Sequence, residues 1–127
     1  MLKQFLLVGA GGFLGSSLRY AVSVVCTRFY PASVFPLSTL IINTTGCFAI
    51  GFIGGLAASK QILAGNGRLF IFTGILGGYT TFSAFGLETF FLMRMEHIRM
   101  ALLNISLQLL LGLAGVALGH WLATKMS

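Results

Sequence analysis

The residues of this chain that could do chemistry are amides and hydroxyls set in apolar sequence. Asn43 lies in "TLIINTTGCF" and is followed by Thr44 and Thr45. An Asn amide offers two hydrogen-bond donors and cannot be left unpaired in hydrocarbon without a large free-energy cost. Asn43 therefore either joins two helices or meets a polar ligand, and both interpretations are open.

A second pair of amides, Asn104 and Gln108, lies four residues apart, with Gly112 one turn further along. Residues four apart share one face of a helix, so the pair predicts a short polar stripe that is open at one end. Such a stripe is suited to lining a wet groove. A hydrogen bond between helices explains it equally well.

The stretch "GGYTTFSAFG" at 77–86 places adjacent glycines and a cluster of hydroxyls inside an apolar run. This composition predicts a helix break near Gly77–Thr80, and the backbone groups that it frees are tolerated at membrane depth only inside protein or facing a cavity. Free carbonyls are good ligands for a hard cation such as Na⁺. Phe82 and Phe85 then face the same way with Ser83 beside them, although two such rings alone are usually core.

Two charged residues also lie inside apolar segments, where an ionisable group is costly and marks a functional site by default. Arg19 lies near the far end of the first segment, and an interfacial anchor and a functional role are equally open. Glu88 lies toward the end of its segment, where a structural hydrogen bond is the simpler explanation. No nucleophile with a base and no paired carboxylates occur, so the pattern does not indicate an enzyme.

The elements that must position these residues are membrane helices. The chain is 57% hydrophobic and 8% charged, whereas a soluble domain carries about 25% charged residues. A bilayer-spanning helix needs about 20 apolar residues, and four segments meet this requirement. They run approximately over 4–26, 36–59, 69–93 and 99–123. We therefore predict an all-α membrane protein in which 1–127 form a single integral membrane domain.

The net charge of +6 does not indicate nucleic acid, because the basic residues lie mostly at segment ends, as interfacial anchors do. If the termini share one side, that side holds Lys3, Lys60, Arg68 and Lys125, and the other holds Arg28, Arg94 and Arg99. Such a small bias allows insertion in both orientations and an antiparallel pair. Since four helices make a thin wall around a polar pathway, we expect an oligomer, with two copies related as inverted repeats are in larger transporters.

Three motifs in this order resemble, along the whole chain, the small fluoride channels of the Fluc (CrcB) family. They are "GGFLGSSLRY" at 11–20, "STLIINTTGCFAIGF" at 38–52 and "TGILGGYTTFSAFGLE" at 73–88. The resemblance implies an antiparallel, dual-topology homodimer of four-helix subunits in a bacterial inner membrane. It also implies passive export of F⁻ through two pores.

The resemblance further implies roles for single residues. Asn43 would donate to fluoride, and Phe82 and Phe85 would line its path with their ring edges. Backbone carbonyls of Gly77 and Thr80 from both subunits would hold one structural Na⁺. With the family's arginine and hydroxyl positions and the stripe on the fourth helix, the expected fluoride pathway comprises Arg19, Thr39, Asn43, Thr81, Phe82, Ser83, Phe85, Asn104 and Gln108.

Two other functions fit parts of the pattern. A small dimeric proton-coupled multidrug exporter needs a carboxylate deep in a central cavity, and Glu88 lies toward a segment end. A non-transporting assembly subunit needs only the many glycines at helical spacing, which let membrane helices approach closely. That second alternative leaves Asn43 and the break in the third segment unexplained.

Overall fold

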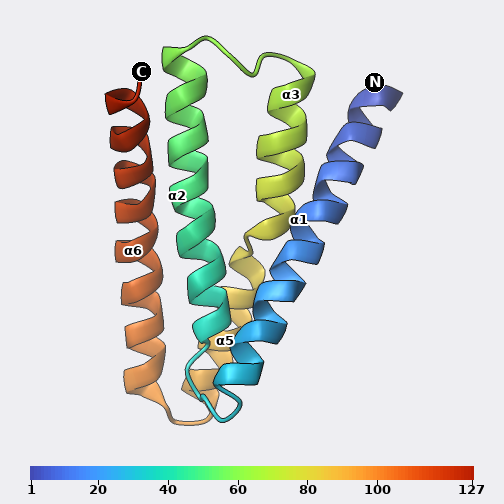
Figure 1. Cartoon of the computed structure of the whole chain (residues 1–127). Coiled ribbons are helices and arrows are strands. Elements are labelled where there is room, and N and C mark those ends of the chain that lie inside the picture. The colour runs from blue at the N-terminus through green and yellow to red at the C-terminus, as the bar shows by residue number, and fades with distance from the viewer.

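The computed structural model describes all 127 residues, Met1–Ser127, as helices and short connections (Figure 1). Four segments are long and apolar enough to cross a membrane: α1 (Leu2–Phe29), α2 (Leu37–Ser59), Asn66–Arg94, and α6 (Ile98–Lys125). The prediction of an all-α chain with four spanning helices is confirmed. Helices α1 and α6 run beyond the expected 4–26 and 99–123, because a helix does not stop where its apolar face ends.

The third segment consists of several pieces. In chain order these are α3 (Asn66–Arg68), the π-helix η1 (Leu69–Leu76), α4 (Gly77–Tyr79) and α5 (Phe82–Arg94). Between α4 and α5 the backbone is extended, with φ −80° and ψ 159° at Thr80 and φ −152° and ψ 113° at Thr81. We call these two residues the interruption. A π-helix is rare and frequently occurs at functional sites.

Helix α1 packs closely on the third segment through glycine. A Cβ at Gly11 would lie 2.9 Å from Gly74 Cα, and a Cβ at Gly15 would lie 2.8 Å from the Tyr79 nitrogen. Small residues let backbones of membrane helices approach this closely. The helix that carries Arg19 is therefore held directly against η1 and α4, next to the interruption.

Helices α2 and α6 form the second close pair, and they lie side by side along their length (Figure 1). A Cβ at Gly119 would lie 2.7 Å from the Phe52 nitrogen, and one at Gly55 would lie 2.7 Å from Ala123 Cβ. Both helices begin at the end of the molecule opposite the chain termini. Asn43 and Gln108 consequently lie in the first half of helices that start from the same side.

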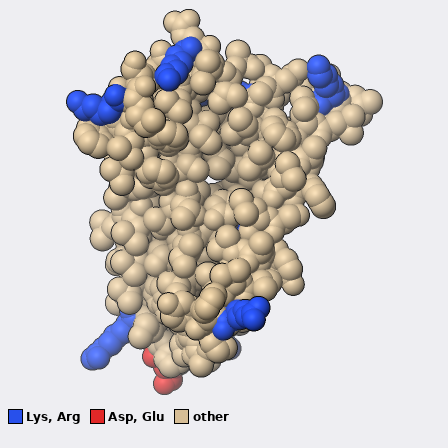
Figure 2. Space-filling model, in the orientation of Figure 1, with Lys and Arg blue, Asp and Glu red and all other residues tan.

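The outer surface suits lipid rather than water. Only 20 of 127 residues are buried, and many large apolar side chains are exposed, including Phe13, Leu113 and Phe82. Figure 2 shows Lys and Arg side chains gathered at the two ends of the molecule, with a broad band of other residues between them. This arrangement is the one expected of helices that cross a hydrocarbon layer with anchors at its interfaces.

Candidate functional site

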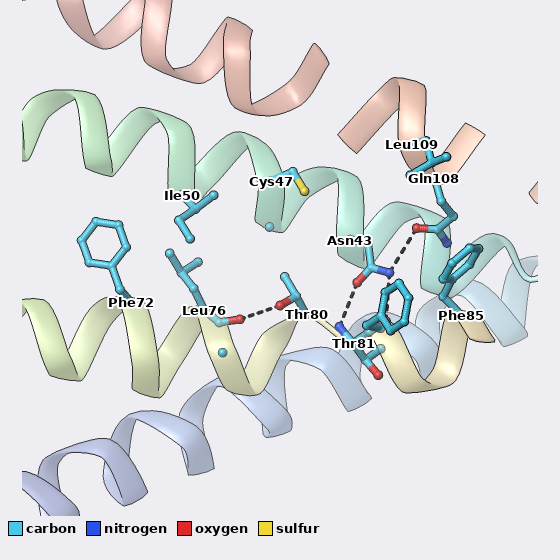
Figure 3. A pocket seen from close by; sticks show the side chains of 13 residues that line it. Asn43, Cys47, Ile50, Phe72, Leu76, Thr80, Thr81, Phe85, Gln108 and Leu109 are labelled. Carbon is cyan, nitrogen blue, oxygen red and sulfur yellow. Dashed lines mark hydrogen bonds between the residues drawn. The ribbon is translucent and has the colours of Figure 1, made fainter. Parts of the chain in front are cut away.

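Two cavities meet at Thr81. The first, of about 340 Å³, lies between α2, α6 and the third segment, and its lining includes Asn43, Phe72, Phe85 and Gln108. We call it the amide cavity (Figure 3). The second, of about 540 Å³, lies between α1, α2 and α5, and its lining includes Arg19, Thr39, Ser83 and Glu88. We call it the charged cavity.

Asn43 holds the interruption in place. Its Nδ2 donates to the Thr81 carbonyl at 3.0 Å, and its Oδ1 accepts from the Thr81 N–H at 2.9 Å (Figure 3). In a continuous helix the Thr81 N–H would instead bond the Gly77 carbonyl. An extended residue presents its N–H and its carbonyl to the same side, so one primary amide can satisfy both, as a neighbouring strand does.

The same amide continues to α6. Asn43 Nδ2 also donates to Gln108 Oε1 at 3.1 Å, so both of its protons have partners. Gln108 Nε2 is buried and has no hydrogen-bond partner. Of the two amides that line the amide cavity, Gln108 is therefore the one whose donor is unpaired. The sequence pattern did not indicate which of the two residues this would be.

The aromatic wall of the amide cavity lies immediately after the interruption. Phe82 and Phe85 have ring centroids 5.5 Å apart and planes inclined by 62°, an edge-to-face arrangement. Phe82 is 83% exposed, whereas Phe85 is half-buried. The edge of a Phe ring carries positive potential, so such rings can face an anion without a formal charge.

Helix α5 begins at the interruption, and its N-cap is Thr81, the residue that lines both cavities. Thr81 Oγ1 accepts from the Ala84 N–H at 3.2 Å, as an N-cap hydroxyl does, and lies 3.3 Å from Ser83 Oγ. The N-terminus of a helix carries partial positive charge. Since α5 has 13 residues, its first turn adds a favourable potential for an anion near Thr81.

The charged cavity contains one carboxylate and one guanidinium. Thr39 Oγ1 donates to Glu88 Oε1 at 2.7 Å, while Glu88 Oε2 is buried without a partner. Arg19 Nη1 donates to the Thr80 carbonyl at 3.5 Å. Glu88 thus makes the structural hydrogen bond that the sequence suggested, and Arg19 contacts the interruption from α1, whereas Asn43 contacts it from α2.

The residues expected along a pathway are distributed between the two cavities. The amide cavity contains Asn43, Gly77, Thr80, Thr81, Phe82, Phe85 and Gln108. The charged cavity contains Arg19, Thr39, Thr81 and Ser83. Asn104 lines neither of them: it is fully buried, and its Nδ2 donates to Thr89 Oγ1 on α5 at 2.9 Å. Although Asn104 and Gln108 lie four residues apart on α6, their side chains meet different helices, α5 and α2.

Some lining residues carry no signal in the sequence. Cys47 and Phe72 line the amide cavity but read as ordinary apolar residues. Tyr79 is buried and its hydroxyl lies 2.8 Å from Thr45 Oγ1, which ties α4 to α2. The link between Asn43 and Gln108 could have been suspected, because both are amides in apolar helices that start from the same side.

These features define a class of protein: a small multi-pass α-helical membrane protein with a donor-lined cavity at an interrupted helix. Comparison with known sequences gives its family. Residues 6–120 match the profile of the CrcB-like proteins, described as "CrcB-like protein, Camphor Resistance (CrcB)", and the chain belongs to this family.

Relatives with curated names resemble the chain over nearly its whole length, and each is named "Fluoride-specific ion channel FluC". One from Azobacteroides pseudotrichonymphae is 42% identical, over 94% of this chain and 95% of its own. One from Helicobacter pylori strain HPAG1 is 45% identical, over 94% and 92%. One from Clostridium novyi is 41% identical, over 91% and 89%.

Proposed function

We propose that this chain forms a fluoride-selective channel through which F⁻ leaves a bacterial cell passively across the inner membrane, lowering cytoplasmic fluoride. The observation that carries the proposal is the amide cavity in a member of the CrcB family whose relatives are named fluoride-specific channels. Fluoride is small and strongly hydrated, so a pore must replace its water with several donors. Neutral amides and ring edges can do so without a fixed charge that would trap the ion.

The proposed route passes both cavities. In the amide cavity fluoride meets amide donors and the edges of Phe82 and Phe85. Thr81 connects this space with the charged cavity, where Thr39 and Ser83 offer hydroxyls. Arg19 in that cavity would attract the anion, and Asn104 would act indirectly by holding α6 against α5.

The working unit of this proposal is an antiparallel homodimer. Phe82 lines the amide cavity yet is 83% exposed, so one copy leaves the aromatic wall uncovered. A second copy in the opposite orientation would cover it and supply the other side of each pathway. The nearly balanced basic residues at the two ends of the helices are compatible with insertion in both orientations.

A structural Na⁺ at the centre of that dimer fits the carbonyl groups of the interruption. Because the Thr81 N–H bonds Asn43, the Gly77 carbonyl loses the partner it would have in a continuous helix. The Thr80 carbonyl has only the long contact with Arg19 and keeps a free lone pair. Carbonyl oxygens are ligands that hard cations prefer, and two copies together would present four. When bound, the ion would join the two interruptions and raise the local potential for anions.

The test of the channel is efflux from liposomes that contain the purified chain and are loaded with either fluoride or chloride. With a K⁺ ionophore to set the voltage, ion electrodes should record rapid fluoride release and negligible chloride release. Protein-free liposomes are the control. Absence of fluoride release, or chloride release at a similar rate, would remove the proposal.

The test of the cation site is purification without Na⁺, with a large organic cation in its place. We expect fewer cross-linked dimers in the membrane and slower fluoride efflux, both restored when Na⁺ is added back. If dimer content and efflux are unchanged over the whole exchange, Gly77 and Thr80 hold no structural Na⁺.

A further inference from the structure

Helix α4 is a three-residue turn that carries one side chain. Its sequence is Gly77–Gly78–Tyr79, so every side-chain contact of α4 is made by Tyr79. Gly77 and Thr80, whose carbonyls form the proposed cation site, lie on either side of Tyr79 in the chain. The way in which Tyr79 is held therefore affects the position of both carbonyls.

Tyr79 is packed between α1 and α2 and is only 8% exposed. On the α1 side, a Cβ at Gly15 would lie 2.8 Å from the Tyr79 nitrogen. A Cβ at Gly78 would lie 2.7 Å from the Gly12 carbonyl oxygen, so the glycine backbones of α1 and α4 are in contact. On the α2 side, a Cβ at Gly46 would lie 3.3 Å from the Tyr79 ring. The backbone of α4 thus packs on α1, while its one side chain packs on α2.

The Tyr79 hydroxyl adds a directed hydrogen bond to α2. It lies 2.8 Å from Thr45 Oγ1, and either of the two hydroxyls could be the donor. Thr45 has a single hydroxyl proton, which it donates to the Ile41 carbonyl at 2.7 Å. Tyr79 is therefore the donor and Thr45 the acceptor. Inside a spanning helix bundle the local dielectric is low, which makes this bond stronger than the same bond at a wet surface.

Two residues of α2 hold the third segment, one on each side of Thr80. After Thr80, the backbone of Thr81 is bonded to Asn43. Before Thr80, the side chain of Tyr79 is bonded to Thr45. The Thr80 carbonyl lies between these two fixed points and keeps a free lone pair. A carbonyl held in this way is suited to act as a ligand of a hard cation.

We infer that Tyr79 is a positioning residue for Na⁺: its hydrogen bond to Thr45 fixes α4 against α2 and so holds the carbonyls of Gly77 and Thr80 at the cation site. This inference rests on the proposed function and adds to it a residue that does not touch the ion. The rigidity of a site tunes its affinity for hard cations. Without the hydrogen bond, the binding of Na⁺ would also have to order the backbone of α4, which weakens binding.

Tyr79→Phe tests this role, because it removes the hydroxyl and keeps the ring on Gly46. Thermal unfolding of the purified chain is followed while Na⁺ replaces a large organic cation at constant ionic strength. A ligand that binds the folded state raises its stability according to the ratio of ligand concentration to Kd. Tyr79→Phe should need about fivefold more Na⁺ for the same gain in Tm, the effect of losing a hydrogen bond of about 1 kcal/mol. An equal Na⁺ requirement in the two chains would contradict the inference, because a tyrosine that only fills the core affects Tm equally with and without Na⁺.

Substitutions at Thr45 show whether the hydrogen bond itself is responsible. Thr45→Val removes the acceptor and should raise the Na⁺ requirement by the same factor, and the double variant with Tyr79→Phe should need no more Na⁺ than either single variant. Thr45→Ser keeps the hydroxyl and should behave as the unmodified chain. Tyr30→Phe, at a tyrosine that is 60% exposed at the end of α1, is the matched control and should leave the Na⁺ requirement unchanged. Additive effects of Tyr79→Phe and Thr45→Val would mean that the two residues act separately, and would overturn the inference.

Fluoride efflux from liposomes made with the same proteins separates this inference from the proposed function. Efflux through Tyr79→Phe should match that of the unmodified chain at high Na⁺ and fall below it when Na⁺ is limiting. If the unmodified chain releases no fluoride, the proposed channel is wrong, whatever the Na⁺ titration shows. If Na⁺ does not raise the Tm of the unmodified chain, the cation site and this inference are both wrong. Fluoride release together with a Na⁺ requirement that Tyr79→Phe leaves unchanged would contradict this inference alone.

Discussion

The two cavities meet at Thr81 and differ in the polar groups that line them. The amide cavity contains neutral donors and aromatic edges, and the charged cavity contains Arg19 and Glu88. A strongly charged site holds an ion tightly, whereas conduction needs binding weak enough for the ion to leave. In the proposed channel we therefore expect selection of the ion where the donors are neutral, while the charges act on its approach and on the backbone of the interruption.

The two cavities also depend on different helix pairs. The amide cavity needs α2 and α6 in contact, because its central hydrogen bond joins Asn43 to Gln108. The charged cavity needs α1 close to the third segment, because Arg19 reaches the Thr80 carbonyl from there. Different glycines hold each helix pair together, so a substitution can disturb one pair without the other.

The largest effect should come from Asn43→Ala, which removes the partners of Thr81 and of Gln108 together. Two backbone groups left unpaired at about 1–3 kcal/mol each would distort the interruption, and we expect fluoride efflux to fall about 100-fold. Thr39→Val in the charged cavity removes one hydrogen bond and should lower fluoride efflux about threefold. Electrode recordings from liposomes with equal protein content decide this. Equal losses of efflux in the two variants would mean that the two cavities do not differ in their importance for fluoride passage.

The sequence predicted the fold of this chain better than its site. Four helices followed from four apolar runs, because hydropathy over about 20 residues reports membrane burial directly. The π-helix η1 was not foreseen, since it depends on how the third segment packs on α1 and not on the residues of Leu69–Leu76 alone.

For the site, the sequence identified the residues and not their contacts. It left Asn43 open between joining helices and meeting a ligand, and the structure shows it bonded to Thr81 and Gln108. The deciding factor is the extended backbone of Thr81, a tertiary feature. The stripe of Asn104 and Gln108 separated for a related reason: the two side chains meet different helices, which no spacing rule within α6 describes.

The next largest effect should come from disturbing the contact between α1 and the third segment. Gly15→Ala would place a Cβ 2.8 Å from the Tyr79 nitrogen and push α1 away from α4. We expect efflux to fall about tenfold and thermal unfolding to occur about 5 °C lower, as overpacking by 1–3 kcal/mol does. Gly9→Ala, on the same helix with nothing within 4 Å of its added Cβ, is the matched control. A Gly15→Ala chain with normal stability and efflux would mean that the contact of α1 does not shape the charged cavity.

A smaller effect should appear when the charges of the charged cavity, on Arg19 and Glu88, are removed one at a time. Arg19→Gln should lower fluoride conductance about threefold and Glu88→Gln should raise it by a similar factor, because opposite charges change the local anion concentration in opposite directions. Raising the ionic strength should reduce both effects. Single-channel or macroscopic currents in planar bilayers measure them. Changes in the same direction would assign both residues to structure, since Arg19 also bonds Thr80 and Glu88 also bonds Thr39.

The smallest effect concerns the end of the amide cavity that lies away from Gln108 and is lined by Phe72 (Figure 3). The guanidinium carbon of Arg68 lies 5.4 Å from the centroid of the Phe72 ring, which places an exposed positive charge at that end. Such a charge raises the local concentration of anions, and the effect fades within a Debye length of about 10 Å at 0.1 M salt. Arg68→Gln should therefore lower fluoride conductance about twofold at low ionic strength and leave it unchanged at high ionic strength. Arg68→Lys should retain the conductance, and Lys60→Gln, which removes a charge that does not lie over the Phe72 ring, should leave it unaltered. A loss in Arg68→Gln that persists at high salt would mean that the residue acts by packing on Phe72, so that electrostatic attraction would be confined to the charged cavity.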